Sequence, residues 1–175
     1  MTDVAAGRYA GIRVHRVEDA RLLTGAGTYV DDVTRPGMLH ACFVRSYLAR
    51  GRILSIDTSE ALALPGVHAV FTAEDLMPDA HQAWFTLVGK DEQDVPRPPL
   101  AVGEVRFVGD PVAVVIADSR YIAEDAAELV FVDYEPLPAQ ADYLTAAGSD
   151  ELVHEEFAGN IFTEVSILPE ETMQE

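Results

Sequence analysis

The sequence VAVVIADSRYIAEDAAELVFVDY, residues 112–134, carries the clearest structural pattern in the chain. Its first six residues are apolar, as in a buried strand, and Asp118 or Ser119 can cap a following helix. Apolar residues then recur at helical spacing while charged residues take the opposite face. The stretch therefore predicts a strand at 112–117, an amphipathic helix and a strand at 131–134. The apolar stripe of that helix comprises Ile122, Ala126, Leu129 and Val130.

Shorter strands are predicted on either side of this stretch. The segment 38–46 has apolar residues at both odd and even positions, which point to opposite sides of a strand. The pattern predicts a strand buried on both faces. Proline cannot donate to a strand ladder, so residues 109–111 are predicted to form a tight turn between strands at 104–108 and 112–117. Further strands are predicted at residues 52–57, 67–72 and 162–168.

A short helix is predicted at residues 60–64, preceded by the capping oxygens of Asp57 to Ser59 and ended by Pro65 and Gly66. One helical turn is predicted at 73–76. These strands and two main helices lack a regular βαβ repeat, which favours an α+β fold with a mixed sheet over a doubly wound sheet.

Three segments are expected along the chain. Residues 1–35 are predicted to form an extended N-terminal arm with turns at Gly25 and Gly27, because glycine punctuates a segment that has no periodicity. Residues 36–143 form the main domain, which contains a long loop at 77–102. Residues 144–175 are a C-terminal extension that ends in an acidic stretch without a clear pattern.

Composition limits the classes of partner. Twelve basic and thirty acidic residues give a formal charge of −18, which repels nucleic acid and anionic lipid. The first residues lack an apolar targeting core and no apolar run could span a bilayer, so a cytoplasmic protein without a membrane span is expected. Cys42 is the only cysteine and is expected to be a buried, inert thiol.

Familiar chemical motifs are missing from the sequence. Gly25 and Gly27 begin like a dinucleotide fingerprint, but Val30 replaces its third glycine. The five histidines, His15, His40, His68, His81 and His154, are too far apart to form a helical or strand pair of metal ligands. No nucleophile elbow or phosphate loop is present. The sequence therefore predicts no catalytic, cofactor-binding or metal-binding residue in this chain.

Two polar-rich segments contain apolar residues that suggest contact surfaces. We expect the arm and the acidic loop to dock against another chain or domain, although an intramolecular contact is an equally good interpretation for the loop. The candidate interface residues are Arg21, Leu22, Leu23, Tyr29, Trp84 and Phe85.

Five blocks in order along the chain resemble large subunits of the xanthine dehydrogenase, aldehyde oxidase and carbon monoxide dehydrogenase family of molybdenum hydroxylases. The first is RVEDARLLTGAGTYVDD at 16–32. The others are PGMLHA at 36–41, IDTSEALALPGV at 56–67, VRFVGDPVA at 105–113, and AEDAAELV with VDYEPLP at 123–138. The similarity extends over residues 11–162 and implies the family's α/β-hammerhead domain.

The resemblance implies a part of a molybdopterin-dependent oxidoreductase that hydroxylates or oxidises a small molecule. Molybdopterin with molybdenum, iron–sulfur clusters and FAD would then reside in the rest of the large subunit and in partner subunits or domains. The family's usual SPHAHARI is SYLARGRI at residues 46–53, so no role is carried over to Leu48 or Arg50. The family's pterin-binding loops and catalytic glutamate lie beyond this region, so no catalytic residue is transferred either.

Three hypotheses follow from this resemblance. The first is a non-catalytic N-terminal scaffold domain, or a split subunit, whose role is assembly. The second is a free-standing acidic binding module that keeps the hammerhead fold, because fold does not determine function. The third is a remnant without function. The substrate is not indicated by these residues.

Overall fold

The computed structural model describes residues 16–76 and 97–161. The chain divides into two compact units, residues 1–38 and 39–175. The segment boundaries predicted at residues 35 and 143 stay predictions. Trp84, Phe85 and the strand predicted at 162–168 lie outside the described residues.

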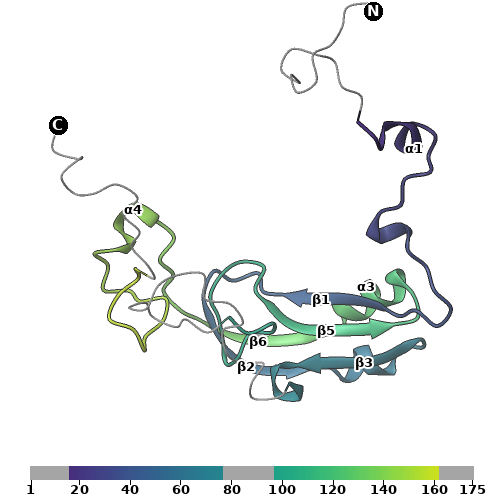
Figure 1. Ribbon diagram of the computed structural model, residues 1–175. Helices are drawn as coiled ribbons and strands as arrows, with labels where there is room; N and C mark the ends of the chain where they lie inside the picture. Colours follow the sequence, from purple (N-terminus) through teal and green to yellow (C-terminus); the bar gives the residue numbers. More distant parts are fainter. Residues whose placement is uncertain (1–15, 77–96, 162–175) are drawn as a thin grey trace, which may run out of the picture. The chain divides into compact units, whose positions relative to one another are not determined.

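The second unit contains two three-stranded sheets (Figure 1). One has the strand order β1-β5-β3 and the other β4-β2-β6. The strands are β1 (His40–Arg45), β2 (Gly51–Asp57), β3 (Val67–Thr72), β4 (Glu104–Val105), β5 (Pro111–Ala117) and β6 (Phe131–Pro136). The helices are α2 (Ser59–Ala63), η2 (Ala73–Asp75), α3 (Arg120–Glu128) and α4 (Tyr143–Ala146).

The α+β class is confirmed, with a difference in the sheets. All strand pairs in the described residues are antiparallel, so they form two antiparallel sheets where a mixed sheet was expected. The reason lies in the connection through α3. This helix follows β5 in one sheet and precedes β6 in the other, so it does not link parallel strands of one sheet.

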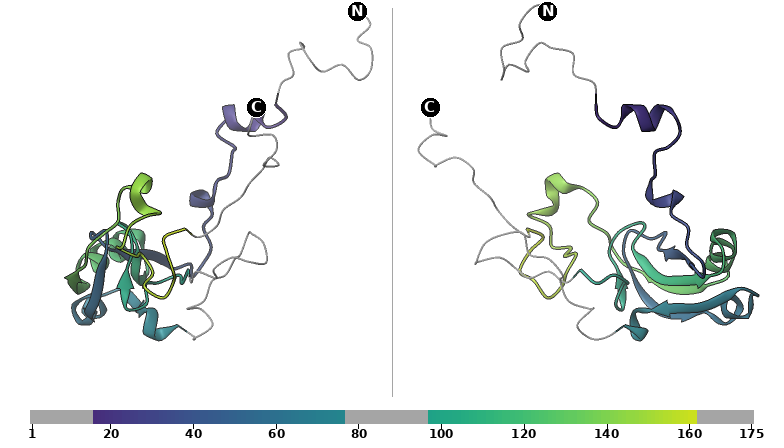
Figure 2. Two further views of the ribbon diagram at one scale, coloured as in Figure 1. Left: turned by 90° about the vertical axis from the view of Figure 1, so that its left-hand side faces the viewer. Right: turned by 45° about the vertical axis from the view of Figure 1, so that its right-hand side comes forward.

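The main helix forms where the pattern predicted it. Ser119 caps α3, and its hydroxyl accepts a hydrogen bond from the Ile122 amide at 3.2 Å. Ala123 and Ala126 are buried on the inner side of the helix, which contacts β1 and β5. Helices α2 and α3 lie at one end of the sheets, and residues 137–161 lie at the other end (Figure 2).

The main core lies between the helices and the inner faces of the two sheets. Ala113 and Val115 of β5 are fully buried and pack with Ala126. Ile56 and Val132 of the second sheet pack against the same cluster. The two sheets and α3 are therefore held together by apolar contact, which contributes about 25 cal/mol per Å² of buried surface.

Two strand predictions were wrong in detail. The strand β1 was expected to be buried on both faces, but half-buried and exposed residues alternate along it. The side chains that point away from the core, including the apolar Phe43, are exposed because nothing in the described residues packs on that face. The second concerns the strand predicted at 104–108, before the turn at 109–111. The turn's neighbours β4 and β5 belong to different sheets, and β4 is only two residues long.

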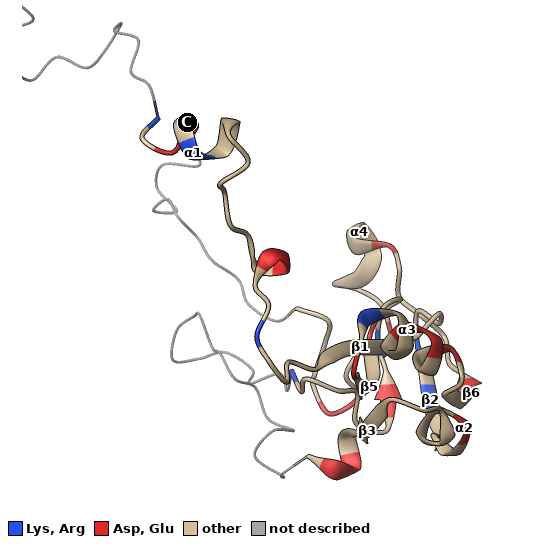
Figure 3. Ribbon diagram, turned by 90° about the vertical axis from the view of Figure 1, so that its right-hand side faces the viewer, with Lys and Arg blue, Asp and Glu red and all other residues tan. Residues whose placement is uncertain are grey.

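The first unit contains a short helix, α1 (Asp19–Leu23), and the 3-10 helix η1 (Val30–Asp32). The arm was predicted to be extended with turns at Gly25 and Gly27; it contains these two short helical segments in addition, and Gly25 has φ +71°, as a turn requires. A Cβ at Gly27 would lie 2.7 Å from Leu22 Cδ2, so the Leu22 side chain packs closely over this glycine. Figure 3 shows the acidic residues of η1 as a red coil between α1 and β1.

Helix α2 ends at Ala63, just before Pro65 and Gly66 as expected, and Gly66 then takes a left-handed conformation. It has φ +90°, and a Cβ there would lie 2.9 Å from Ile122 Cδ1. We expect Gly66→Ala to lower the free energy of unfolding by about 1–2 kcal/mol in urea titrations. Gly148→Ala is the control, because its added Cβ meets nothing within 4 Å, and it should change stability by less than about 0.5 kcal/mol. Equal losses in both variants would contradict this packing.

Candidate functional site

Three of the four candidate interface residues on the arm, Arg21, Leu23 and Tyr29, are exposed. Leu23 is 87% exposed and Tyr29 is 68% exposed. Leu22 is half-buried beside Gly27, and Arg21 forms an ion pair with Glu18 on the surface of α1. The structure thus leaves these apolar side chains available for contact, and their role in docking stays a prediction.

The outer apolar face is the surface of the β1-β5-β3 sheet that points away from α3 and the second sheet. Paired residues on neighbouring strands point to the same side of a sheet. Val44, Val70 and Val115 point into the core, so the alternate positions point outward. Two cross-strand rows make up this face, Phe43 with Val114 and Phe71, and Ala41 with Ile116 and Ala69.

The second sheet has a different outer surface. Arg52 pairs with Glu135 across β2 and β6, where the two residues also form an ion pair, and Ser55 lies opposite Asp133. Figure 3 shows the charged residues on these two strands. Charged and hydroxyl groups remain hydrated in such positions, so this face is suited to solvent. The outer face of the first sheet is apolar and that of the second sheet is charged, so the first is the better candidate for a contact surface.

Arg50 forms a buried polar cluster beside the second sheet. Its side chain is 6% exposed. Its Nε donates to Glu104 Oε1 at 2.7 Å and its Nη2 donates to Glu155 Oε1 at 3.0 Å. The hydrogen bond with Glu104 is the main cause of the raised pKa of Arg50. One guanidinium thereby holds residues 104 and 155 together, although 51 positions separate them in the sequence.

A recess of about 670 Å³ lies next to this cluster, between residues 97–111 and 153–161. Its wall is largely apolar, with Phe107 and Phe157 among the lining residues. The Arg106 Nε donates to the Val153 carbonyl at 3.2 Å and so connects the two walls. Burial raises the pKa of Asp110, and the hydrogen bond from the Arg106 amide opposes that shift.

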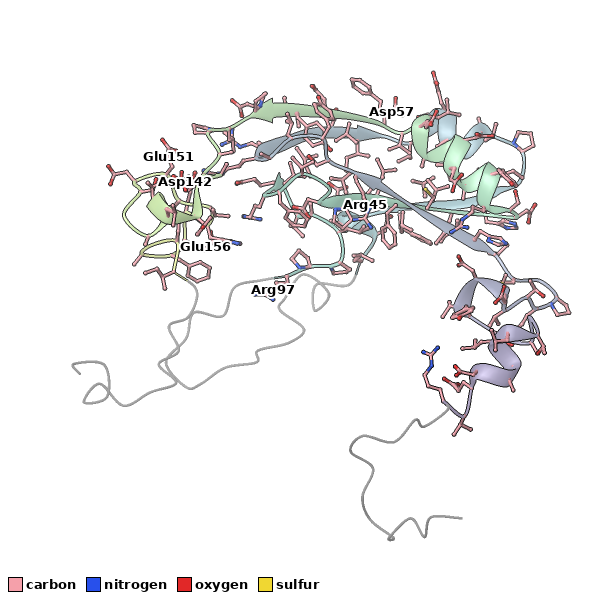
Figure 4. The ribbon with its side chains drawn as sticks, turned by 90° about the horizontal axis from the view of Figure 1, so that it is seen from above. Arg45, Asp57, Arg97, Asp142, Glu151 and Glu156 are labelled. Atoms are coloured by element: carbon pink, nitrogen blue, oxygen red, sulfur yellow. The ribbon has the colours of Figure 1, made fainter. Side chains whose placement is uncertain are left out.

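The surface carboxylates do not gather around one centre. Figure 4 shows Asp142, Glu151 and Glu156 at the end of the unit that bears the recess, and Asp57 at the opposite end. His154 lies 3.2 Å from Glu156, and His68 lies 2.7 Å from Asp118. Within residues 16–76 and 97–161, no three His, Cys, Asp or Glu side chains form a group that could hold a metal ion.

Cys42 faces α3 and is half-buried. Burial is the main cause of its raised pKa, and the charge of Glu124 adds to it. Because the thiolate is the reactive form, this environment lowers the reactivity of the thiol near neutral pH. The expected burial of Cys42 was therefore too strong, while its environment suits an inert thiol.

Sequence reasoning missed the two features with the clearest geometry. Arg50 stands where a histidine was expected from the resemblance, and nothing local indicates its partners at residues 104 and 155. The sequence contained a partial indication of the outer apolar face, because β5 is apolar throughout and β3 carries apolar residues at both odd and even positions. The absence of cover in the described residues is visible only in three dimensions.

Comparison with known proteins gives a consistent result. The model of the "Aldehyde oxidase and xanthine dehydrogenase, a/b hammerhead domain" family matches residues 24–138. The carbon monoxide dehydrogenase large chain of Afipia carboxidovorans is 53% identical over 140 residues, which cover 80% of this chain and 17% of that protein. The xanthine dehydrogenase molybdenum-binding subunit of Escherichia coli O157:H7 is 40% identical over 128 residues, or 70% of this chain and 17% of that protein.

A solved structure shows the same fold. Quinoline 2-oxidoreductase from Pseudomonas putida 86 superposes with a TM-score of 0.79 at 44% identity, and the match covers 86% of this chain and 19% of that one. The chain thus spans about a sixth of the length of the curated relatives it matches.

The Arg50 cluster predicts a large effect of a single substitution. Arg50→Met would leave the mostly buried Glu104 without its partner, so we expect a loss of about 3 kcal/mol in the free energy of unfolding. Arg52→Met removes the exposed ion pair with Glu135 and should cost less than about 1 kcal/mol. Urea unfolding followed by circular dichroism measures both. A similar loss in the two variants would show that the cluster has no special role.

Proposed function

The chain belongs to the aldehyde oxidase and xanthine dehydrogenase family through its a/b hammerhead domain, and we propose from this that it is the non-catalytic, N-terminal scaffold domain of a molybdopterin-dependent oxidoreductase. The whole enzyme hydroxylates or oxidises a small molecule. The observation that carries the proposal is the close match to relatives of which the chain spans only 17%. A domain of this kind serves assembly by presenting surfaces on which the remaining polypeptide packs.

The residues of this chain do not fit an iron–sulfur cluster. The clusters of iron–sulfur proteins are held by several cysteines, and the chain has one. The described residues also contain no group of three possible metal ligands. The proposal therefore assigns molybdopterin with molybdenum, the iron–sulfur clusters and FAD to other polypeptide in the assembly, and no step of their chemistry is derived from this chain.

The proposed partners are the molybdopterin-binding part of the large subunit and the iron–sulfur and FAD subunits or domains. Support comes from the exposed apolar side chains of the arm, since such residues in a polar segment are typical of contact surfaces. In the part of the chain that the structure describes, no helix is long and apolar enough to cross a membrane. A cytoplasmic assembly is part of the proposal.

Assembly can be tested by co-purification. We expect the tagged chain, produced in its source organism with added molybdate, to elute with a molybdenum-containing polypeptide at near-equal molar amounts. Leu23→Asp with Tyr29→Asp should lower the molybdenum recovered per chain by about tenfold, because charge is introduced into an apolar contact. Molybdenum content and size-exclusion chromatography give the measurement.

The matched control places the same charges on exposed apolar residues elsewhere. Tyr143 is 83% exposed and Leu144 is 76% exposed, and both lie on α4, outside the arm. Tyr143→Asp with Leu144→Asp should leave the recovered molybdenum unchanged. Absence of molybdenum from the unmodified chain would overturn the scaffold function.

A further inference from the structure

We infer that the outer apolar face of the β1-β5-β3 sheet is the docking surface for the polypeptide that carries the molybdopterin. The inference rests on the proposed scaffold function and assigns it a surface that the sequence did not indicate. The occupant is an apolar surface of that polypeptide, packed across the two cross-strand rows that contain Phe43, Phe71, Val114 and Ile116.

The outer apolar face contains no polar residue in its two cross-strand rows. Every position in the two rows is apolar, and each row contains one residue from each of the three strands. A sheet that faces water usually alternates apolar and polar positions, as the second sheet does with Arg52 and Glu135. An apolar sheet face is therefore expected to be covered by another element.

The described residues leave this face partly uncovered. Val112 is not part of it, because Val112 lies at the register shift between β1 and β5 and packs into the core with Val105 of the second sheet. Phe43 is 44% exposed and Phe71 is 41% exposed. The uncovered part thus presents two aromatic rings on either side of Val114, and aromatic side chains dominate the energetics of many interfaces.

Arg45 marks one limit of the face. Its guanidinium carbon lies 5.4 Å from the centre of the Phe43 ring, and its Nη1 donates to the Gly109 carbonyl at 2.9 Å. It is the one charged residue among the outward positions of β1, β3 and β5. An apolar centre with a charged residue at its edge resembles the core and rim of a protein interface.

Charge and chain length favour a different polypeptide over a second copy as the occupant. Two copies would each bring a formal charge of −18, and this repulsion opposes face-to-face association. The relatives contain about five times more polypeptide than the chain spans, since the matches cover 17% of them. That additional polypeptide is the source of a surface to cover the face.

The test introduces charge into the face and measures the molybdenum recovered. Phe71→Glu and Phe43→Glu should each lower the molybdenum-containing polypeptide that co-elutes with the tagged chain by about tenfold or more. Phe131→Glu is the matched control, because Phe131 is a 65% exposed aromatic residue on β6 of the other sheet, and it should retain the unmodified amount. Circular dichroism checks that each variant is folded.

Phe71→Ala provides a second variant that adds no charge, so the test remains decisive if Phe71→Glu does not fold. A folded Phe71→Ala chain should recover less molybdenum than Phe131→Ala. Unchanged recovery in the folded Phe43 and Phe71 variants would overturn this inference while leaving the scaffold function intact. Lack of molybdenum in the unmodified chain would overturn the scaffold function itself. A dimer of the chain that Phe71→Glu dissociates, with molybdenum recovery unchanged, would assign the face to a second copy and overturn the inference.

Discussion

The central strand β5 imposes the main constraint on this structure, because it is apolar at every position from Pro111 to Ala117. Such a strand is stable when both faces of its sheet are removed from water. One face is buried by α3 and the second sheet through Ala113 and Val115. On the other face, the described residues leave Val114 and Ile116 only half-buried and the flanking Phe43 and Phe71 exposed. The need to cover this second face connects the fold to a role in assembly.

The Arg50 cluster serves a different purpose from the apolar core. It connects β4, through Glu104, to the segment around Glu155, and the Arg106 hydrogen bond to Val153 reinforces the same contact. Burial of a guanidinium is unfavourable unless its hydrogen bonds are made, so this geometry is specific. The cluster fixes the end of the unit opposite α2 and α3, and thereby gives the sheets a defined boundary on that side.

Local patterns in the sequence were sufficient for most elements and insufficient for their pairing. Ser119 and the spacing of Ile122 and Ala126 predicted α3, although Leu129 and Val130 of the predicted stripe lie beyond its end at Glu128, and Pro65 with Gly66 predicted the end of α2. The partition of strands between two sheets depends on contacts distant in sequence, so the predicted turn at 109–111 did not reveal that the strands on its two sides belong to different sheets. For the site, Leu23 and Tyr29 were identified from composition and are exposed. Phe43 and Phe71 were missed because their exposure depends on what the rest of the chain leaves uncovered.

The central claim is that the outer apolar face becomes buried when the chain is assembled. Hydroxyl-radical footprinting of the chain alone and with the molybdenum-containing polypeptide measures this directly at single aromatic side chains. If the face is the docking surface, Phe43 and Phe71 are strongly protected in the assembly, and Phe131 is as reactive as before. Equal reactivity of Phe43 and Phe71 in the two states would contradict it.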